Sequence, residues 1–210
     1  REESLQEGKR AIGTKFVNSL LKKRLFSSPA AFASTLEKHI NTIHYGSGKE
    51  ASATIEDRIL RKAIQRAEED YADDQTFEEA QYDAVEQATR QSAPFSADEK
   101  KMISRLRDWG QRAQFKADSK SKAVCEWIDA HLKTDGEWNE KRVILFTEYR
   151  TTQQWLEKTL IEKGFGGDRL EMINGSMDAE ERERIKAAFQ THPKDAPVRI
   201  LLATDAASEG

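Results

Sequence analysis

Three short polar segments in the last third of the chain have the residue types that bind phosphate groups. They are residues 147–150 (Thr-Glu-Tyr-Arg), 174–176 (Asn-Gly-Ser) and 204–210 (Thr-Asp-Ala-Ala-Ser-Glu-Gly). Each segment follows a run of apolar residues. Glycines, hydroxyl groups and small side chains allow phosphate oxygens to accept hydrogen bonds from backbone N–H groups and short side chains. The three segments therefore predict a surface that holds phosphates.

The apolar runs before these segments predict three strands, and the stretches between them predict helices. The near-continuous apolar run at 142–147 is typical of a strand buried on both faces. The alternation is strand 142–147, helix 151–163, strand 170–173, helix 178–190 and strand 198–203. This order favours a parallel, doubly wound sheet. Ligands of such sheets bind beyond the carboxyl ends of the strands, so we expect the three polar segments to meet there.

Nearly all of the chain before residue 140 has the apolar spacing of helices. Ser28 and Pro29 separate the first two helices as N-cap and first helical residue, and Lys22-Lys23-Arg24 falls on the polar face. A capping-box pattern begins at Ser96, and a further helix follows Asp118. The residues expected to point inward from the capping-box helix are Met102, Ile103, Leu106 and Trp109, and Trp127 is expected on the apolar face of the helix after Asp118.

The stretch from Glu68 to Glu86 is strongly acidic. It holds nine acidic residues and no lysine or arginine. Such a charge run predicts a solvated surface or a mobile insertion. We do not expect it to touch a nucleic-acid backbone, because like charges repel.

Composition limits the classes of partner. The 210 residues suit one large or two small domains, and the net charge of −3 gives no overall attraction to nucleic acid. A nucleic-acid role therefore needs a local basic face or a partner that supplies the charge. The single cysteine, Cys125, and four scattered histidines predict neither a disulfide nor a metal site. We expect a cytoplasmic protein without a membrane partner, since no apolar run approaches the roughly 18–20 residues of a membrane span.

The order of the motifs resembles the second RecA-like lobe of superfamily-two helicases and translocases. Residues 143–150 resemble the family's fourth motif. Residues 173–177 (Ile-Asn-Gly-Ser-Met), followed by Glu181-Arg182 and Phe189, resemble its G-x-M…E-R…F element. Residues 200–210 closely resemble its fifth motif. The residues of these motifs are most similar to those of bacterial Swi/Snf-like translocases of the polymerase-recycling and DISARM types.

This resemblance implies roles for individual residues. Family members bind ATP with Mg between two RecA-like lobes, and the nucleic-acid strand crosses both. The residues expected along the strand path are Thr147, Gly175, Ser176 and Thr204. The residues expected near the nucleotide cleft, or coupling it to the strand, are Asp205, Ser208, Glu209 and Gly210. Arg150 and Arg169 are further candidates for charge on the strand path, with surface roles as the alternative.

The resemblance also implies what these 210 residues lack. They contain no G-x-x-x-x-G-K-[ST] phosphate loop and no Asp-Glu-x-His box, and the family's arginine finger would follow Gly210. We therefore expect no catalytic residue, tight ATP binding or ATP hydrolysis in this chain alone. Both ends are expected to be cuts in a longer protein, whose first RecA-like lobe would be the partner.

Three functions remain open from the sequence. The first is the second motor lobe of an ATP-driven translocase acting on double-stranded DNA. The second is a silent α/β interaction module, and the third is an RNA helicase lobe. The expected organisation is a helical region at 1–117 followed by a truncated RecA-like α/β lobe at 118–210.

Overall fold

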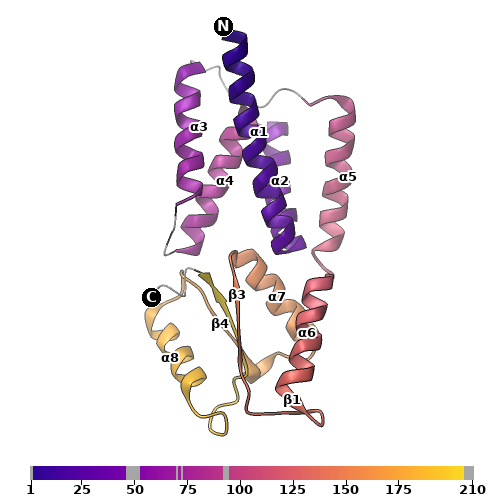
Figure 1. Ribbon diagram of the computed structural model, residues 1–210, viewed down its shortest axis with the longest axis vertical. Helices are drawn as coiled ribbons and strands as arrows, with labels where there is room; N and C mark the ends of the chain where they lie inside the picture. The colour runs from indigo at the N-terminus through magenta and orange to yellow at the C-terminus, as the bar shows by residue number, and fades with distance from the viewer. Residues whose placement is uncertain (1, 46–52, 70, 72, 92–94, 206–210) are drawn as a thin grey trace. The chain divides into compact units, whose positions relative to one another are not determined.

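The computed structural model describes residues 2–45, 53–69, 71, 73–91 and 95–205. The chain divides into two compact units (Figure 1). The first, called the helical unit here, comprises residues 1–71 and 76–114. The second, called the sheet unit, comprises residues 72–75 and 115–210.

The helical unit is built from long helices. They are α1 (Glu2–Ser27), α2 (Pro29–Tyr45), α3 (Ala53–Ala67), α4 (Asp74–Arg90) and α5 (Ala97–Ala113). Ser28 separates α1 from α2 as predicted, because its Oγ accepts a 3.1 Å hydrogen bond from the Ala31 N–H. The capping box of α5 is also confirmed, with Ser96 and Glu99 exchanging backbone and side-chain bonds. In the described ranges, no helix has both the length and the apolar character needed to cross a membrane.

Small residues allow close packing within the helical unit. The core includes a cluster of Phe32, Leu36 and Ile40 on α2, against which Ile103 of α5 packs. Gly110 lets α5 approach α2 closely, because a Cβ there would lie 3.3 Å from the Ala33 Cβ. The pattern predicted Met102, Leu106 and Trp109 to be buried too, and this was wrong: all three are exposed, as is Trp127 on α6 (Ser119–Leu132). Within α5 a narrow stripe around Ile103 and Gly110 meets α2, and the wider apolar face remains uncovered.

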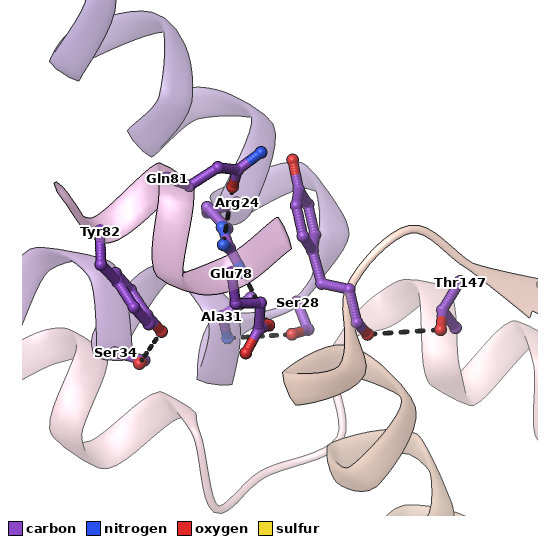
Figure 2. Close-up of polar contacts among 9 residues, drawn as sticks. Arg24, Ser28, Ala31, Ser34, Glu78, Gln81, Tyr82 and Thr147 are labelled. Atoms are coloured by element: carbon purple, nitrogen blue, oxygen red, sulfur yellow. Dashed lines mark hydrogen bonds and ion pairs between the residues drawn. The ribbon is translucent and has the colours of Figure 1, made fainter. Parts of the chain in front are cut away.

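The expectation of a solvated or mobile acidic insertion holds for only part of the stretch, in which several acids are exposed. Much of the stretch is α4, whose Ala84 and Val85 are completely buried. Arg24, predicted on the polar face of α1, is also fully buried. Its guanidinium forms a 3.2 Å ion pair with Glu78 and a 2.7 Å hydrogen bond to Gln81 (Figure 2). The acids of α4 thus lie beside an apolar stripe, and Glu78 neutralises a buried cation.

The sheet unit follows the predicted alternation of strands and helices. After α6 comes a hairpin of β1 (Lys133–Thr134) and β2 (Glu137–Trp138), which turns at Asp135 and Gly136. The remaining elements are β3 (Val143–Thr147), α7 (Arg150–Glu162), the 3-10 turn η1 (Gly167–Arg169), β4 (Leu170–Ile173), α8 (Ala179–Gln190) and β5 (Ile200–Thr204).

The strands β3, β4 and β5 form one parallel sheet in the order β3-β5-β4. The helices α7 and α8 lie on opposite sides of it (Figure 1). The α8 side holds a core of Ile173, Ile185 and Leu201, with Met177 and Phe189 packed against it. The predicted α/β fold, with a parallel sheet after a helical region, is confirmed.

One expectation about the sheet was wrong. The strand β3 is not buried on both faces, because Ile144 and Phe146 are exposed. Register explains the difference. Ile144 pairs with Leu201, which lies in the α8-side core, so Ile144 and Phe146 point to that same side. The helix α8 packs on β4, two strands away, and leaves this face of β3 open.

Candidate nucleic-acid interface

The parallel sheet brings the described residues of the three predicted segments to one edge. Thr147 and Thr204 are the last residues of the neighbouring strands β3 and β5, and they are partners in the register. Gly175 and Ser176 follow β4, on the other side of β5. All of them lie at the carboxyl ends of the strands, where open α/β sheets bind ligands.

Two aspartates contact this edge from a distant part of the sequence. The Asp74 Oδ2 atom accepts hydrogen bonds from the Gly175 N–H at 2.5 Å and the Thr204 Oγ1 hydroxyl at 2.8 Å. The Asp73 Oδ1 atom accepts one from the Ser176 Oγ hydroxyl at 2.5 Å. Both aspartates belong to residues 72–75, the segment that clusters with the sheet unit. No local sequence pattern indicates these contacts, which span more than a hundred positions.

The contacts show what this edge can bind chemically. A backbone N–H and two hydroxyls, from the end of β5 and the turn after β4, donate to carboxylate oxygens. One oxygen of Asp74 bridges β4 and β5 in this way. Phosphate oxygens accept hydrogen bonds from the same donors, so the edge is suited to a compact anion.

The turn after β4 is held in place by two arginines. Arg150, at the start of α7, donates a 2.6 Å hydrogen bond to the Asn174 Oδ1 atom. Arg182, on α8, donates from its Nη2 atom to the carbonyls of Asn174 and Gly175 at 3.1 and 3.2 Å. These bonds orient the Gly175 N–H and Ser176 toward the aspartates. Arg150 therefore lies at the edge, as the sequence suggested, and serves there as a brace.

The other residues of the G-x-M…E-R…F element have structural roles. Met177 and Phe189 pack against the core under α8. Asp178 caps α8, because its Oδ1 atom accepts hydrogen bonds from the N–H groups of Glu180 and Glu181. The element thus fixes the angle between the turn and α8.

A residue that the sequence did not reveal, Gln153, ties β4 and β5 to α7. Its side chain is buried, and its Nε2 atom donates to the carbonyls of Ile173 at 2.8 Å and Leu202 at 3.0 Å. These carbonyls lie at the end of β4 and near the end of β5. Gln153 therefore positions the two strand ends that carry Gly175 and Thr204. A polar residue on a helical pattern gives no hint of this role.

Thr147 is placed at the edge, with its hydroxyl directed to its own loop. The Thr147 Oγ1 atom donates a 3.3 Å hydrogen bond to the Tyr149 carbonyl (Figure 2). Thr147 and Tyr149 are both buried. Among the predicted strand-path residues, Thr147 thus differs from Gly175, Ser176 and Thr204, which all donate to carboxylates.

The residues expected at the nucleotide cleft are only partly described. Asp205 directly follows β5 and is exposed. Ser208, Glu209 and Gly210 lie outside the described residues. The described residues therefore offer no test of how ATP with Mg would fit, and its binding stays a prediction.

Arg169 lies at the opposite end of the sheet from the strand path suggested for it. It precedes β4 and donates a 2.9 Å hydrogen bond to the Pro197 carbonyl. Nearby, Arg199 is buried and donates to several backbone carbonyls, those of Asn139, Pro193, Ala196, Pro197 and Val198. Burial lowers the pKa of Arg199, and the neighbouring charges of Arg169 and Arg142 lower it further. These arginines hold the loop before β5 rather than a ligand.

Comparison with known proteins identifies the C-terminal part. Residues 119–210 match the family described as "Helicase conserved C-terminal domain". The match supports a helicase C-terminal lobe in this segment. It covers α6, the parallel sheet and the predicted strand-path residues of the lobe. No curated protein and no solved structure matches the chain.

Proposed function

We propose that the lobe is the second motor lobe of an ATP-driven DNA translocase of the Swi/Snf-like type. In this proposal Gly175, Ser176 and Thr204 donate hydrogen bonds to the phosphates of double-stranded DNA, and Thr147 borders the same path. Backbone contacts of this kind carry no sequence information, as a motor that moves along DNA requires.

One observation carries the proposal. The donors from the turn after β4 and the end of β5 are already engaged with carboxylate oxygens, at 2.5–2.8 Å. They are therefore oriented toward a shared anion-accepting position at the carboxyl edge. The match to a helicase C-terminal domain covers these residues and supports nucleic acid as the source of the anion.

The nucleotide and partner are part of the same proposal. ATP with Mg would be held mainly by a first RecA-like lobe, with Asp205, Ser208, Glu209 and Gly210 completing the cleft. Asp205 would couple the cleft to the phosphate contacts, because it directly follows Thr204. We place this motor in the cytoplasm.

Binding to labelled duplexes tests the proposal. Fluorescence anisotropy at about 50 mM salt would compare double-stranded DNA with double-stranded RNA, since nonspecific affinities of about 10⁻⁴–10⁻⁶ M tighten at low salt. Thr204→Val and Ser176→Ala are each expected to weaken DNA binding about fivefold, the value of roughly one hydrogen bond. Thr191→Val is the matched control, because the Thr191 hydroxyl bonds the Ala187 carbonyl at the end of α8.

The outcomes separate the three functions. Weaker binding by Thr204→Val and Ser176→Ala, with Thr191→Val unchanged and DNA preferred, supports the translocase. Equal or stronger binding of RNA favours an RNA helicase lobe. A silent interaction module is favoured if no variant binds either duplex. This includes the variants described below, in which the edge is more accessible.

A further inference from the structure

We propose that Asp73 and Asp74 form a self-supplied lid on the phosphate-binding edge, which nucleic acid must displace in order to bind. The inference rests on the proposed function and adds a mode of regulation to the same site. The lid is the acidic segment at residues 73–74, and the position it closes is defined by Gly175, Ser176 and Thr204.

The two aspartates of the lid occupy the donors of the predicted phosphate site. Two adjacent carboxylates accept hydrogen bonds from three donors that the sequence assigns to the nucleic-acid path. Asp74 is only 2% exposed, so its charge has been taken out of water and is stabilised by Gly175 and Thr204. The aspartates thus occupy these donors as phosphate oxygens would.

The lid and a phosphate cannot occupy the edge at the same time. Thr204 is 0% exposed while its hydroxyl donates to Asp74, so a phosphate cannot reach that hydroxyl without moving the aspartate. Each hydroxyl has one proton to donate, and each of these protons points to a carboxylate. A phosphate would also carry the same sign of charge as the aspartates. The edge therefore holds either the lid or nucleic acid.

The lid lies at the start of a helix, in a short connection of the chain. Asp74 is the first residue of α4, and the segment 72–75 lies between α3 and the rest of α4. Three hydrogen bonds from the sheet unit's edge engage the lid, and two of them meet at one oxygen of Asp74. The aspartates take no part in the pairing of β4 with β5, so moving their carboxylates away would leave that pairing intact.

The negative charge of the acidic stretch has a different meaning if the stretch contains the lid. The sequence predicted that this stretch avoids nucleic acid because like charges repel. The same charge suits a competitor for a phosphate site, since the lid and the phosphate backbone accept hydrogen bonds from the same donors. If the aspartates only stabilised the edge and did not compete with nucleic acid, removal of their charge would leave the affinity for DNA unaffected.

The test compares two double variants of the full chain with equal changes in charge. Asp73→Asn with Asp74→Asn removes the charge of the lid. Glu68→Gln with Glu69→Gln removes the same charge from exposed positions at the end of α3. The lid variant is expected to bind labelled double-stranded DNA about tenfold more tightly than the control variant, because neutral acceptors compete less well than charged ones.

Salt dependence gives a second readout. The slope of log K against log salt counts phosphates that Lys and Arg neutralise, and the donors at this edge carry no charge. The lid variant should therefore bind more tightly than the control by about the same factor at every salt concentration. Asp73→Asn alone, which removes the charge at one hydroxyl contact, is the milder variant if the double variant does not fold. Circular dichroism establishes that each variant is folded.

The outcomes distinguish the lid from the proposed function. Tighter binding in the lid variant than in the control, kept at every salt concentration, supports both. If the lid variant matches the control while Thr204→Val weakens binding by the parent chain, the lid is overturned and the function stands. If no folded variant binds DNA, including the lid variant, both proposals are overturned.

Discussion

At the scale of single residues, the candidate interface depends on Gln153. Its amide bonds the carbonyls of Ile173 and Leu202, and so links α7 to the ends of β4 and β5. We predict that Gln153→Leu lowers the free energy of unfolding by about 1–3 kcal/mol, because two buried carbonyls lose their donor. Urea denaturation followed by circular dichroism measures the change.

The neighbouring Gln154 provides the control for this prediction. Gln154 is exposed on the same helix, so Gln154→Leu makes the same chemical change without touching the strand ends. We expect it to alter the unfolding free energy by about 0.5 kcal/mol or less. Equal effects of the two substitutions would show that Gln153 does not position the edge.

A second residue-scale prediction concerns pH. His39 is buried, and burial lowers its pKa below 6.5. The Thr89 hydroxyl donates to the Val85 carbonyl at 2.6 Å, so the His39 Nδ1–H must be the donor in its 2.7 Å bond with Thr89. The folded protein therefore contains a neutral imidazole, which the Nδ1–H tautomer fits.

The sign of the effect follows from proton binding. Below pH 6.5 the unfolded chain binds a proton at His39 that the folded chain does not, so stability falls as the pH is lowered from about 6.5. We predict that the denaturation midpoint drops between pH 7.5 and 5.5, and that His39→Gln reduces this drop. The exposed His131 gives the control, and His131→Gln should leave the pH dependence in place. A drop of the same size in His39→Gln would contradict the assignment.

The residues that sequence reasoning found and missed differ in kind. The positions of Thr147, Gly175, Ser176 and Thr204 at one edge follow from strand order alone, because parallel strands end together. Their partners Asp73 and Asp74 do not, since a contact across a hundred residues leaves no local pattern. The buried Arg24 was misjudged for the same reason, as its partner Glu78 lies on another helix.

At the scale of elements, the strand β3 has one uncovered face. Phe146 is 57% exposed on the α8 side of the sheet, because α8 packs on β4 and does not cover β3. Phe165, in the loop after α7, is fully buried beside Trp138. We predict that Phe165→Ala costs about 3–5 kcal/mol of stability and Phe146→Ala about 1 kcal/mol or less. Chemical denaturation of both variants measures the difference, and similar costs would mean that Phe146 is covered in solution.

Element boundaries could be predicted where periodicity and caps agree, as at Ser28 and Ser96. The direction of each face was less predictable. Met102 and Trp109 have the spacing of a buried face, yet both are exposed, and Trp109 contacts Phe32 of α2 in an edge-to-face ring arrangement. The buried face of α4 was missed because its acids dominate the composition, although Ala84, Val85 and Ala88 mark a buried stripe. Spacing reveals that a face is apolar, and only packing decides whether it is covered.

At the scale of the whole molecule, the two units differ in how far they can be interpreted. The match to a helicase C-terminal domain begins at residue 119, close to the start of the continuous part of the sheet unit. The helical unit lies outside this match. Asp74, whose carboxylate accepts from the Gly175 N–H, clusters with the sheet unit.

The last prediction concerns the reaction that the 210 residues can perform. Phosphoryl transfer from ATP needs a phosphate-binding loop, a site for Mg and an arginine that stabilises the transition state. The sequence contains no G-x-x-x-x-G-K-[ST] loop, so the main phosphate cradle is absent from these residues. We predict no ATP hydrolysis above a buffer blank, with or without double-stranded DNA. Release of inorganic phosphate is the measurement. Turnover that co-purifies with the chain and changes with Thr204→Val would contradict the prediction, whereas turnover unaffected by that substitution would identify a contaminant.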